Sequence, residues 1–242
     1  MRRPISPDIL LPLTVLLLLT ALFRATDWDL ALAKRFFSAE TGWTLVEGQP
    51  WRFLYDHGPK PGVSLGVGAL ALLLTSLLAR SLVRHRRSAL FLVLALLVGP
   101  GLLVNAVLRD HWGRPRPRDL ALFGGEASHW RVLEWRPGGT GHSFPSGHAS
   151  SAFFLFAPFF LLRRTRRRWA IFFLVLGVLY GVLMGIARMG QGAHFASDVA
   201  WAGGITYFTC LGIARLLRAG EPVKDRSAGS ADHRRAARNE AA

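Results

Sequence analysis

The sequence predicts an all-α polytopic membrane protein. Of its 242 residues, 51% are hydrophobic, and these residues gather in long runs that contain few charges. A helix needs about 20 mostly apolar residues to cross the hydrocarbon core of a bilayer. Six runs reach or approach that length, and arginines flank them. Together these features favour a bundle of six transmembrane helices over a soluble domain.

The six expected transmembrane helices are Ile5–Phe23, Ser64–Leu82, Ala89–Leu108, His148–Leu162, Trp169–Ala187 and Phe195–Leu217. The fourth run is shorter than a full span, but five arginines lie between positions 163 and 168, directly after it. Long arginine side chains can reach the membrane interface and so extend a short span. We interpret the first run as an uncleaved helix, because no small-residue cleavage site follows it.

Arginines mark alternate ends of the six runs, which predicts the orientation of the bundle. They are Arg2, Arg3, Arg80, Arg84, Arg86, Arg87, the cluster from Arg163 to Arg168, Arg215 and Arg218. By the positive-inside rule these ends are cytoplasmic, and both termini are cytoplasmic with them. The expected domain covers residues 1–220, and residues 221–242, which lack apolar periodicity, are expected to form a disordered basic cytoplasmic tail.

The strong positive charge points to an anionic partner. The formal net charge is +15, from 30 basic and 15 acidic residues. Such a charge suits nucleic acid, an anionic membrane surface or an anionic substrate. We exclude nucleic acid, because the basic residues flank apolar runs and do not interleave with aromatics in a soluble module. The single cysteine, Cys210, excludes an intrachain disulfide and a cysteine metal cluster.

The loop between the third and fourth runs breaks the charge pattern. It should lie outside, where positive charge is disfavoured, yet it carries six arginines. These are Arg109, Arg114, Arg116, Arg118, Arg131 and Arg136. Positive charge kept against the topological preference indicates an anionic ligand.

Three polar clusters fall at the expected outer ends of the last four helices. They span residues 109–117, 144–148 and 188–198. Arg109, Arg116 and Arg188 offer planar, permanently charged donors that suit phosphate oxygens. Ser146 and Gly147 begin the fourth helix, where free backbone N–H groups favour an anion. The sequence therefore predicts a phosphate-binding site.

Two histidines and an aspartate supply reactive groups for this site. His194 and Asp198 are four residues apart, so we expect them on one helix face. There the carboxylate of Asp198 can accept a hydrogen bond from one ring nitrogen and leave the other nitrogen free as a nucleophile. His148 arrives from another helix and can donate a proton to a leaving oxygen.

The three clusters resemble the signature motifs of the type 2 phosphatidic acid phosphatase superfamily. Those motifs are Lys-x6-Arg-Pro, Pro-Ser-Gly-His and Ser-Arg-x5-His-x3-Asp, and all three occur here in order with their spacing kept. The sequence departs from them twice, with Arg109 in place of the lysine and Ala187 in place of the serine. The first change keeps the charge but alters its geometry, and we assign no role to Ala187.

The resemblance implies a six-helix membrane phosphatase that needs no metal and no other cofactor. It implies that His194 attacks phosphorus and forms a phosphohistidine, that Asp198 orients it, and that His148 protonates the leaving group and then activates water. The residues implied to hold the phosphoryl oxygens are Arg109, Arg116, Ser146, Gly147 and Arg188. The implied partners are a phosphorylated envelope lipid and the bilayer, with the site at the outer face of the inner membrane. No feature of the sequence specifies an oligomeric state.

Several alternatives stay open beside this interpretation. His148, His194 and Asp198 also form a possible metal set, although nearby arginines would repel a cation. Related soluble enzymes oxidise halides with vanadate, a lipid phosphotransferase would use the same phosphohistidine, and a lipid-binding protein or transporter would not be catalytic. Among lipid substrates, the run from His111 to Pro117 followed by Phe123-Gly-Gly is most similar to lipid A 1-phosphatases. Undecaprenyl pyrophosphate and phosphatidylglycerol phosphate are the other expected candidates.

Overall fold

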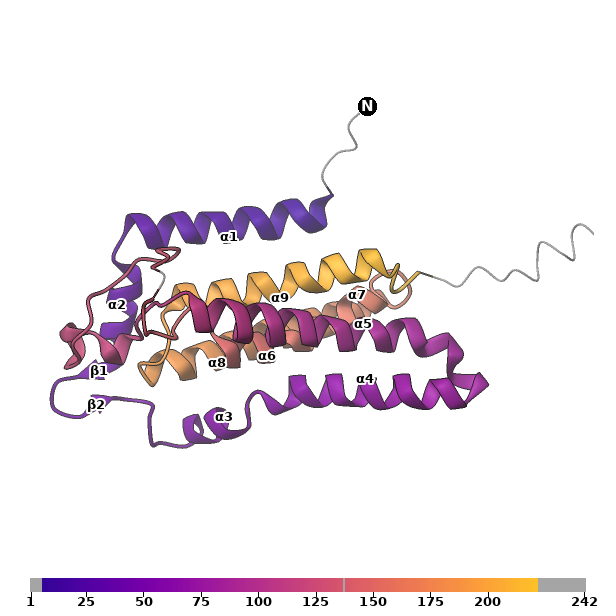
Figure 1. Cartoon of the computed structure of the whole chain (residues 1–242), viewed down its shortest axis with the longest axis horizontal. Coiled ribbons are helices and arrows are strands. Elements are labelled where there is room, and N and C mark those ends of the chain that lie inside the picture. Colours follow the sequence, from indigo (N-terminus) through magenta and orange to yellow (C-terminus); the bar gives the residue numbers. More distant parts are fainter. Residues whose placement is uncertain (1–5, 137, 222–242) are drawn as a thin grey trace, which may run out of the picture.

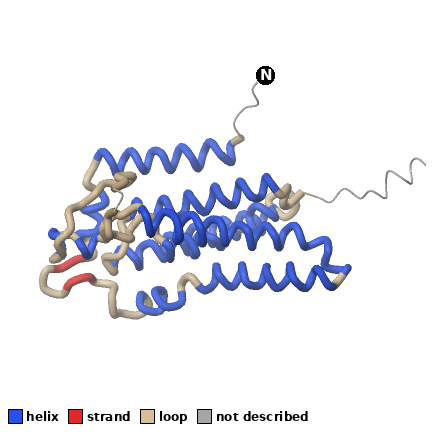
Figure 2. The backbone as a smooth tube through the Cα atoms, viewed as in Figure 1, coloured by secondary structure: helices blue, strands red, loops and turns tan. Residues whose placement is uncertain are grey.

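The computed structural model describes residues 6–136 and 138–221, and about 70% of the protein is helical (Figures 1 and 2). The long helices are α1 (Pro7–Ala25), α4 (Lys60–Leu78), α8 (Arg167–Gly190), α9 (Ala196–Leu216) and the continuous pair α5 (Arg86–Leu96) and η2 (Leu97–Arg109). The shorter helical elements are α2 (Trp28–Lys34), α3 (Trp51–His57), η1 (Arg80–His85), η3 (Pro117–Asp119), η4 (Ala121–Phe123), α6 (Gly147–Phe153), η5 (Phe154–Phe156) and α7 (Pro158–Leu162). Strands β1 (Phe37–Ser38) and β2 (Gly42–Trp43) form one antiparallel hairpin, which pairs Phe37 with Trp43.

The prediction of an all-α polytopic bundle is confirmed, and the count of six spans stays a prediction. Within residues 6–136 and 138–221, five helical segments are long and apolar enough to cross a membrane: Pro7–Ala25, Trp51–Leu78, Arg80–Arg109, Arg167–Gly190 and Ala196–Leu216. The second begins well before the expected Ser64, because α3 leads directly into α4. The expected fourth span corresponds to Gly147–Leu162, which is shorter.

The short segment Gly147–Leu162 forms the centre of the bundle. Its elements α6, η5 and α7 pack against α8, and α6 also packs against α9, η2 and α4. Phe153, Phe154, Phe156 and Phe160 are buried there. On α8, a Cβ atom at Gly181 would lie 2.2 Å from the ring of Phe153, so only glycine permits this close approach. Other helices therefore surround the segment, and most of its side chains are buried inside the bundle.

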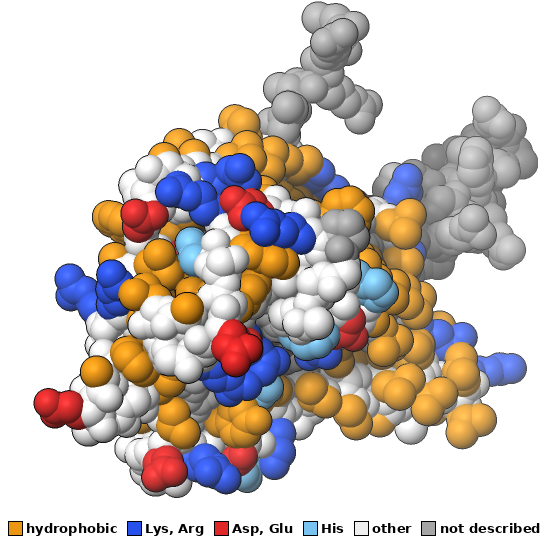
Figure 3. Space-filling view, turned by 60° about the vertical axis from the view of Figure 1, so that its left-hand side comes forward, with side chains coloured by type: hydrophobic (Ala, Val, Ile, Leu, Met, Phe, Trp, Pro, Cys, Tyr) orange, Lys and Arg blue, Asp and Glu red, His pale blue; other side chains and the backbone are white. Residues whose placement is uncertain are grey.

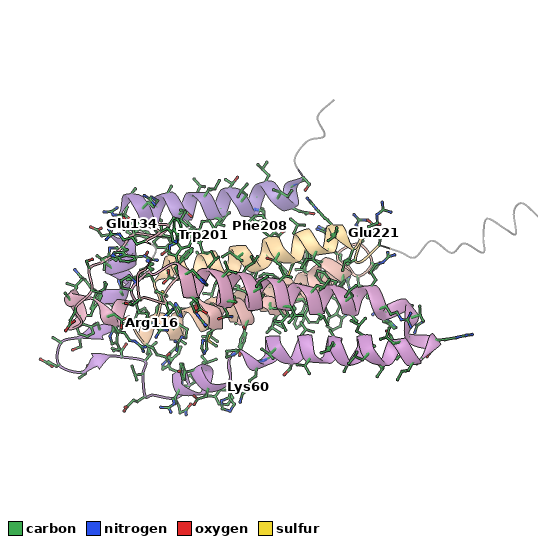
Figure 4. The ribbon with its side chains drawn as sticks, in the orientation of Figure 1. Lys60, Arg116, Glu134, Trp201, Phe208 and Glu221 are labelled. Carbon is green, nitrogen blue, oxygen red and sulfur yellow. The ribbon has the colours of Figure 1, made fainter. Side chains whose placement is uncertain are left out.

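The two ends of the bundle differ in chemistry. Arg163 bonds Asp8 at 2.6 Å, and Arg164 bonds Glu221 at 3.1 Å, so the expected cytoplasmic ends of α1, α7 and α9 lie together. At the opposite end, the loop after η2 packs against α2 and the hairpin. Figure 4 labels Arg116 at this end and Glu221 at the arginine-rich end. Exposed leucines and valines cover the flanks between the ends, including Leu17, Leu74 and Leu179.

The expected disordered tail, apart from Glu221, lies outside the described residues, as do Arg2 and Arg3. The ends of the described chain at Ser6 and Glu221 both lie at the arginine-rich end, where Arg215 bonds Ser6.

Candidate active site

A cavity of about 350 Å³ opens at the end of the bundle opposite the arginine clusters. The residues that line it are Val46, Arg52, Tyr55, Arg109, Arg116, Arg118, His148, Arg188, Gln191 and His194. Figure 3 looks towards this end of the molecule and shows basic side chains (blue) and histidines (pale blue) close together on its surface. Among the described residues, the cavity lining therefore holds five arginines and two histidines but no carboxylate, which is the composition expected of an anion site.

His194 lies in the turn that joins α8 to α9, and its imidazole is 4% exposed. Its Nδ1 lies 2.7 Å from the carbonyl oxygen of Ser143. A carbonyl only accepts hydrogen bonds, so Nδ1 donates the proton and Nε2 keeps its lone pair. Burial lowers the pKa of His194 well below its usual value, and Arg188 lowers it further. The imidazole is thus neutral, and its chemical form suits a nucleophile.

The expected hydrogen bond between His194 and Asp198 is not formed. His194 precedes the first residue of α9, Ala196, so the two residues do not share a helix face. The Asp198 carboxylate instead accepts a hydrogen bond from the backbone N–H of Phe195 at 2.8 Å, which caps the start of α9. It lies 4.0 Å from Nδ1 of His194. The same carboxylate accepts from the hydroxyl of Ser143 at 2.6 Å, so Ser143 connects Asp198 to His194.

Behind Asp198 lies a buried ionic network that sequence reasoning missed. The fully buried guanidinium of Arg114 donates to Asp198 at 2.5 Å and to Asp29 of α2 at 2.9 Å. Asp29 also accepts from the backbone N–H of Ser197 at 3.0 Å. Burial alone would lower the pKa of Arg114, but Asp198 and Asp29 outweigh burial and raise it. A guanidinium shared by two carboxylates holds the start of α9 in place.

The three arginines predicted to bind phosphate all reach the cavity. Arg109 donates to the side chain of Asn105 at 2.6 Å, which fixes it one helical turn away on η2. Arg188 donates to Gln191, and its guanidinium lies 4.7 Å from the ring centroid of Tyr55. The Nε atoms of Arg116 and Arg188 are buried without a partner among the described residues. Burial and the neighbouring Arg118 lower the pKa of Arg116, which indicates closely crowded positive charges.

His148 enters the cavity from the first turn of α6. Its ring stacks on Tyr55 of α3, with centroids 5.5 Å apart and an interplanar angle of 13°. Tyr55 therefore contacts both His148 and Arg188. Nothing in the sequence pattern marks Tyr55, which lies more than 90 positions before His148.

Ser146, Gly147 and Asp198 lie behind the cavity and do not line it. The buried hydroxyl of Ser146 accepts from the backbone N–H of Ala149, so it acts as the N-cap of α6. Gly147 lets Asn105 and Arg109 approach, since a Cβ there would lie 2.3 Å from the Asn105 side-chain oxygen. The roles expected of these two residues in phosphate binding stay predictions.

The other arginines of the loop after η2 are not equivalent. Arg118 lines the cavity. Arg114 belongs to the buried network, Arg131 bonds the backbone of Arg24, and Arg136 lies over the ring of Trp130. Loop arginines thus serve two purposes, and only part of the excess charge faces the cavity.

Comparison with known families and proteins agrees with this arrangement. Residues 88–220 match the family model of the PAP2 superfamily. The match covers more than half of the chain, and the chain belongs to this superfamily. The expected resemblance to type 2 phosphatidic acid phosphatases is thereby confirmed.

Three curated lipid A 4'-phosphatases are similar to this chain. The chain is 36% identical over 136 residues to that of Francisella tularensis subsp. novicida, which covers 56% of this chain and 60% of the relative. It is 38% identical over 121 residues to the Rhizobium etli protein, and the match covers 48% of this chain and 46% of the relative. It is 38% identical over 120 residues to the Rhizobium leguminosarum protein, and the match covers 48% of this chain and 50% of the relative. The chain thus spans about half the length of these relatives, and no solved structure matches it.

Proposed function

We propose that this chain is a membrane lipid phosphatase that removes a phosphate group through a phosphohistidine intermediate. The observation that carries the proposal is the buried, neutral His194 at the wall of a cavity lined by five arginines. A neutral imidazole supplies a nucleophile, and arginines stabilise the charge of a transferring phosphoryl group.

In the proposed mechanism, Nε2 of His194 attacks phosphorus while Nδ1 stays bonded to Ser143. Arg109, Arg116 and Arg188 line the cavity and bind the phosphoryl oxygens through their guanidinium groups. His148 protonates the leaving oxygen and then takes a proton from water, which releases phosphate from His194. Asp198 supports His194 through hydrogen bonds to Ser143, and its carboxylate lies 4.0 Å from Nδ1 of His194.

Lipid A is the substrate that we propose first. The relatives are named lipid A 4'-phosphatases, which favours the 4'-phosphate over the 1-phosphate that the short motif around His111 indicated. The cavity lies at a helix end, so a headgroup can enter it while the acyl chains stay beside the apolar flanks. We further propose that this end faces the periplasm from the inner membrane, because the arginine clusters lie at the other end.

The decisive experiment is a substrate panel with purified protein in detergent. Lipid A, undecaprenyl pyrophosphate and phosphatidylglycerol phosphate are compared by kcat/KM under matched salt, and mass spectrometry identifies which lipid A phosphate is lost. We expect lipid A to be the best substrate and to lose its 4'-phosphate. If lipid A is turned over more slowly than either rival, that rival replaces it as the proposed substrate. Loss of the 1-phosphate would show that the proposed 4' position is wrong.

Substitutions at the two histidines test the mechanism. His194→Gln should lower kcat by about four orders of magnitude or more, because the nucleophile is lost. His148→Gln should lower kcat by about 10²- to 10⁴-fold for a lipid, but much less for p-nitrophenyl phosphate, whose leaving group needs no proton. Trapping of acid-labile phosphate on the wild type but not on His194→Gln identifies the intermediate. Equal loss on both substrates for His148→Gln would contradict its role as the acid.

A further inference from the structure

Two of the five arginines in the cavity lie outside the three family motifs. Arg52 comes from α3, and Arg118 comes from η3, directly after the first motif. Neither has a role in the mechanism described above. Their side chains are 58% and 47% exposed, so both can reach a ligand without leaving a buried position.

Both arginines are tied to groups at the reaction centre. The backbone N–H of Arg118 donates to the carbonyl of Gly192 at 3.0 Å, two residues before His194. Arg52 lies three residues before Tyr55 on α3, and residues at this spacing share a helix face. Tyr55 stacks on His148. The positions of Arg52 and Arg118 are therefore fixed relative to the two histidines.

The cavity carries more positive charge than one phosphate requires. A phosphate monoester has a charge of about −2, and Arg109, Arg116 and Arg188 already exceed it. The carboxylate of Asp56 bonds the Nε atom of Arg52 at 3.2 Å. The carboxylate of Asp119 lies 3.9 Å from the Nε atom of Arg118. Neither aspartate lines the cavity. In an empty cavity, Arg52 and Arg118 would repel each other and the three phosphate-binding arginines. They therefore favour a ligand with additional negative charge.

We propose that Arg52 and Arg118 form a second anion subsite, which binds another anionic group of the same substrate molecule close to the phosphate that is removed. This inference rests on the proposed function and narrows its substrate class to headgroups that carry a second phosphate or a carboxylate near the first phosphate. Planar guanidinium groups bind either anion through paired hydrogen bonds.

Two small probes test the subsite without turnover. Methylphosphonate carries one phosphonate, and methylenediphosphonate carries two that an enzyme cannot separate by hydrolysis. We measure their binding to the purified protein by calorimetry and expect the wild type to prefer the diphosphonate. Arg118→Gln and Arg52→Gln should each weaken diphosphonate binding by about tenfold, the loss of one charge-assisted hydrogen bond. Methylphosphonate binding should change less than about twofold.

Control variants separate the subsite from general electrostatics. Arg136→Gln removes the same charge from a side chain that is 59% exposed and lies outside the cavity, and it should leave both probes unaffected. Arg118→Lys should recover part of the preference, because the charge returns without the planar fork. Equal weakening of both probes by Arg118→Gln, or no weakening of either, would overturn the proposal.

The two possible anion sources and the proposed function are distinguished by turnover. Lipid substrates with a second phosphate, with a carboxylate, or with neither are compared in wild type and Arg118→Gln. A selective loss of kcat/KM for one anionic class identifies the source and supports the subsite, and equal losses for all three lipids contradict it. If the diphosphonate preference depends on Arg118 but no phosphorylated lipid is hydrolysed, the subsite stands and the proposed function fails.

Discussion

His194 is held neutral by burial, and this has a consequence for stability as well as for nucleophilicity. Burial lowers the pKa of His194 well below 6.5, whereas an unfolded chain binds a proton near that value. The unfolded state therefore gains protons as the pH falls, and the folded state does not. The contribution of His194 to the free energy of unfolding is therefore fully present above about pH 6.5. It decreases below that pH by up to about 1.4 kcal/mol for each pH unit.

We expect the midpoint temperature of thermal unfolding in detergent to decrease when the pH is lowered from about 7.5 to about 5.5. The decrease should be smaller for His194→Gln. His129, whose pKa burial also lowers, contributes to both proteins, so the difference between them isolates His194. Scanning calorimetry or intrinsic fluorescence measures the midpoints. An identical pH dependence in the two proteins would contradict the neutral, buried state of His194.

Asp29 offers a second test at the level of single residues. Asp29→Asn removes one of the two carboxylates that share Arg114, and Asp198 remains as the partner of the guanidinium. The charge pair that is left is balanced, so we expect the protein to fold. The start of α9 should shift slightly, and misplaced reacting groups lower kcat by about 10- to 100-fold. The Michaelis constant should change little, because Asp29 does not line the cavity.

Asp27→Asn is the matched control for Asp29→Asn. Asp27 lies two residues away, its side chain is 72% exposed, and its one ion pair within the described part of the chain is with Arg131 at the surface. Its substitution should leave kcat and KM within about twofold of the wild type. A kcat for Asp29→Asn no lower than that of Asp27→Asn would show that the buried network does not position the nucleophile.

The sequence predicted which side chains meet in the cavity but not the contacts that orient them. His148, His194 and three arginines were recognisable because their residue types and spacing match the chemistry of phosphate transfer. Ser143 and Asp29 were not, because an ordinary serine and a surface-like aspartate acquire their roles only through folding. The expected hydrogen bond between His194 and Asp198 is not formed, and the two side chains lie 4.0 Å apart, since spacing of four implies one helix face only when both residues are helical.

At the level of elements, the contact between η2 and α6 determines where Arg109 lies. Pro100 lacks a backbone N–H, and the carbonyl of Pro100 accepts from the side chain of Asn105 at 2.6 Å, within a π-helical stretch. Asn105 then holds Arg109. Hydrophobicity alone predicted a helix here, and it could not predict the wider turns or the packing of Asn105 against Gly147.

This contact predicts the effect of a small substitution. In Gly147→Ala the new methyl group would lie 2.3 Å from the side-chain oxygen of Asn105 and 3.4 Å from a guanidinium nitrogen of Arg109. We expect Asn105 and Arg109 to be displaced and kcat/KM to fall by about 100-fold. Gly212→Ala on α9 is the control, since no atom lies within 4 Å of the added carbon. If Gly147→Ala stays within about twofold of Gly212→Ala in kcat/KM, the contact does not position Arg109.

At the level of the whole molecule, the segment before the family match completes the site. Asp29, Arg52 and Tyr55 all precede residue 88, where the match begins. Asp29 reaches the network behind Asp198, while Arg52 and Tyr55 reach the cavity. These contacts join parts of the chain that are far apart in sequence, and no local pattern encodes them. The long helices were predictable because hydrophobicity is local, whereas the site draws on three separate regions.

The same arrangement ties the position of the site to the orientation of the bundle. The arginine clusters and the cavity lie at opposite ends of the bundle, so they face opposite sides of the membrane. The positive-inside rule predicts that the clusters are cytoplasmic and the cavity is outside. Cysteine labelling tests this directly, because the one native cysteine, Cys210, is buried and should stay unreactive.

Ser128→Cys and Ser81→Cys introduce exposed thiols at the cavity end and at the arginine-rich end. Neither residue lines the cavity, so both variants should keep the activity of the wild type, which confirms that they are folded. A membrane-impermeant maleimide applied to intact spheroplasts should label Ser128→Cys at once and Ser81→Cys only after permeabilisation. The unmodified protein, with Cys210 alone, gives the background. Labelling of Ser81→Cys before permeabilisation, with Ser128→Cys protected, would place the cavity in the cytoplasm and would direct the search for the substrate to lipids of the inner leaflet.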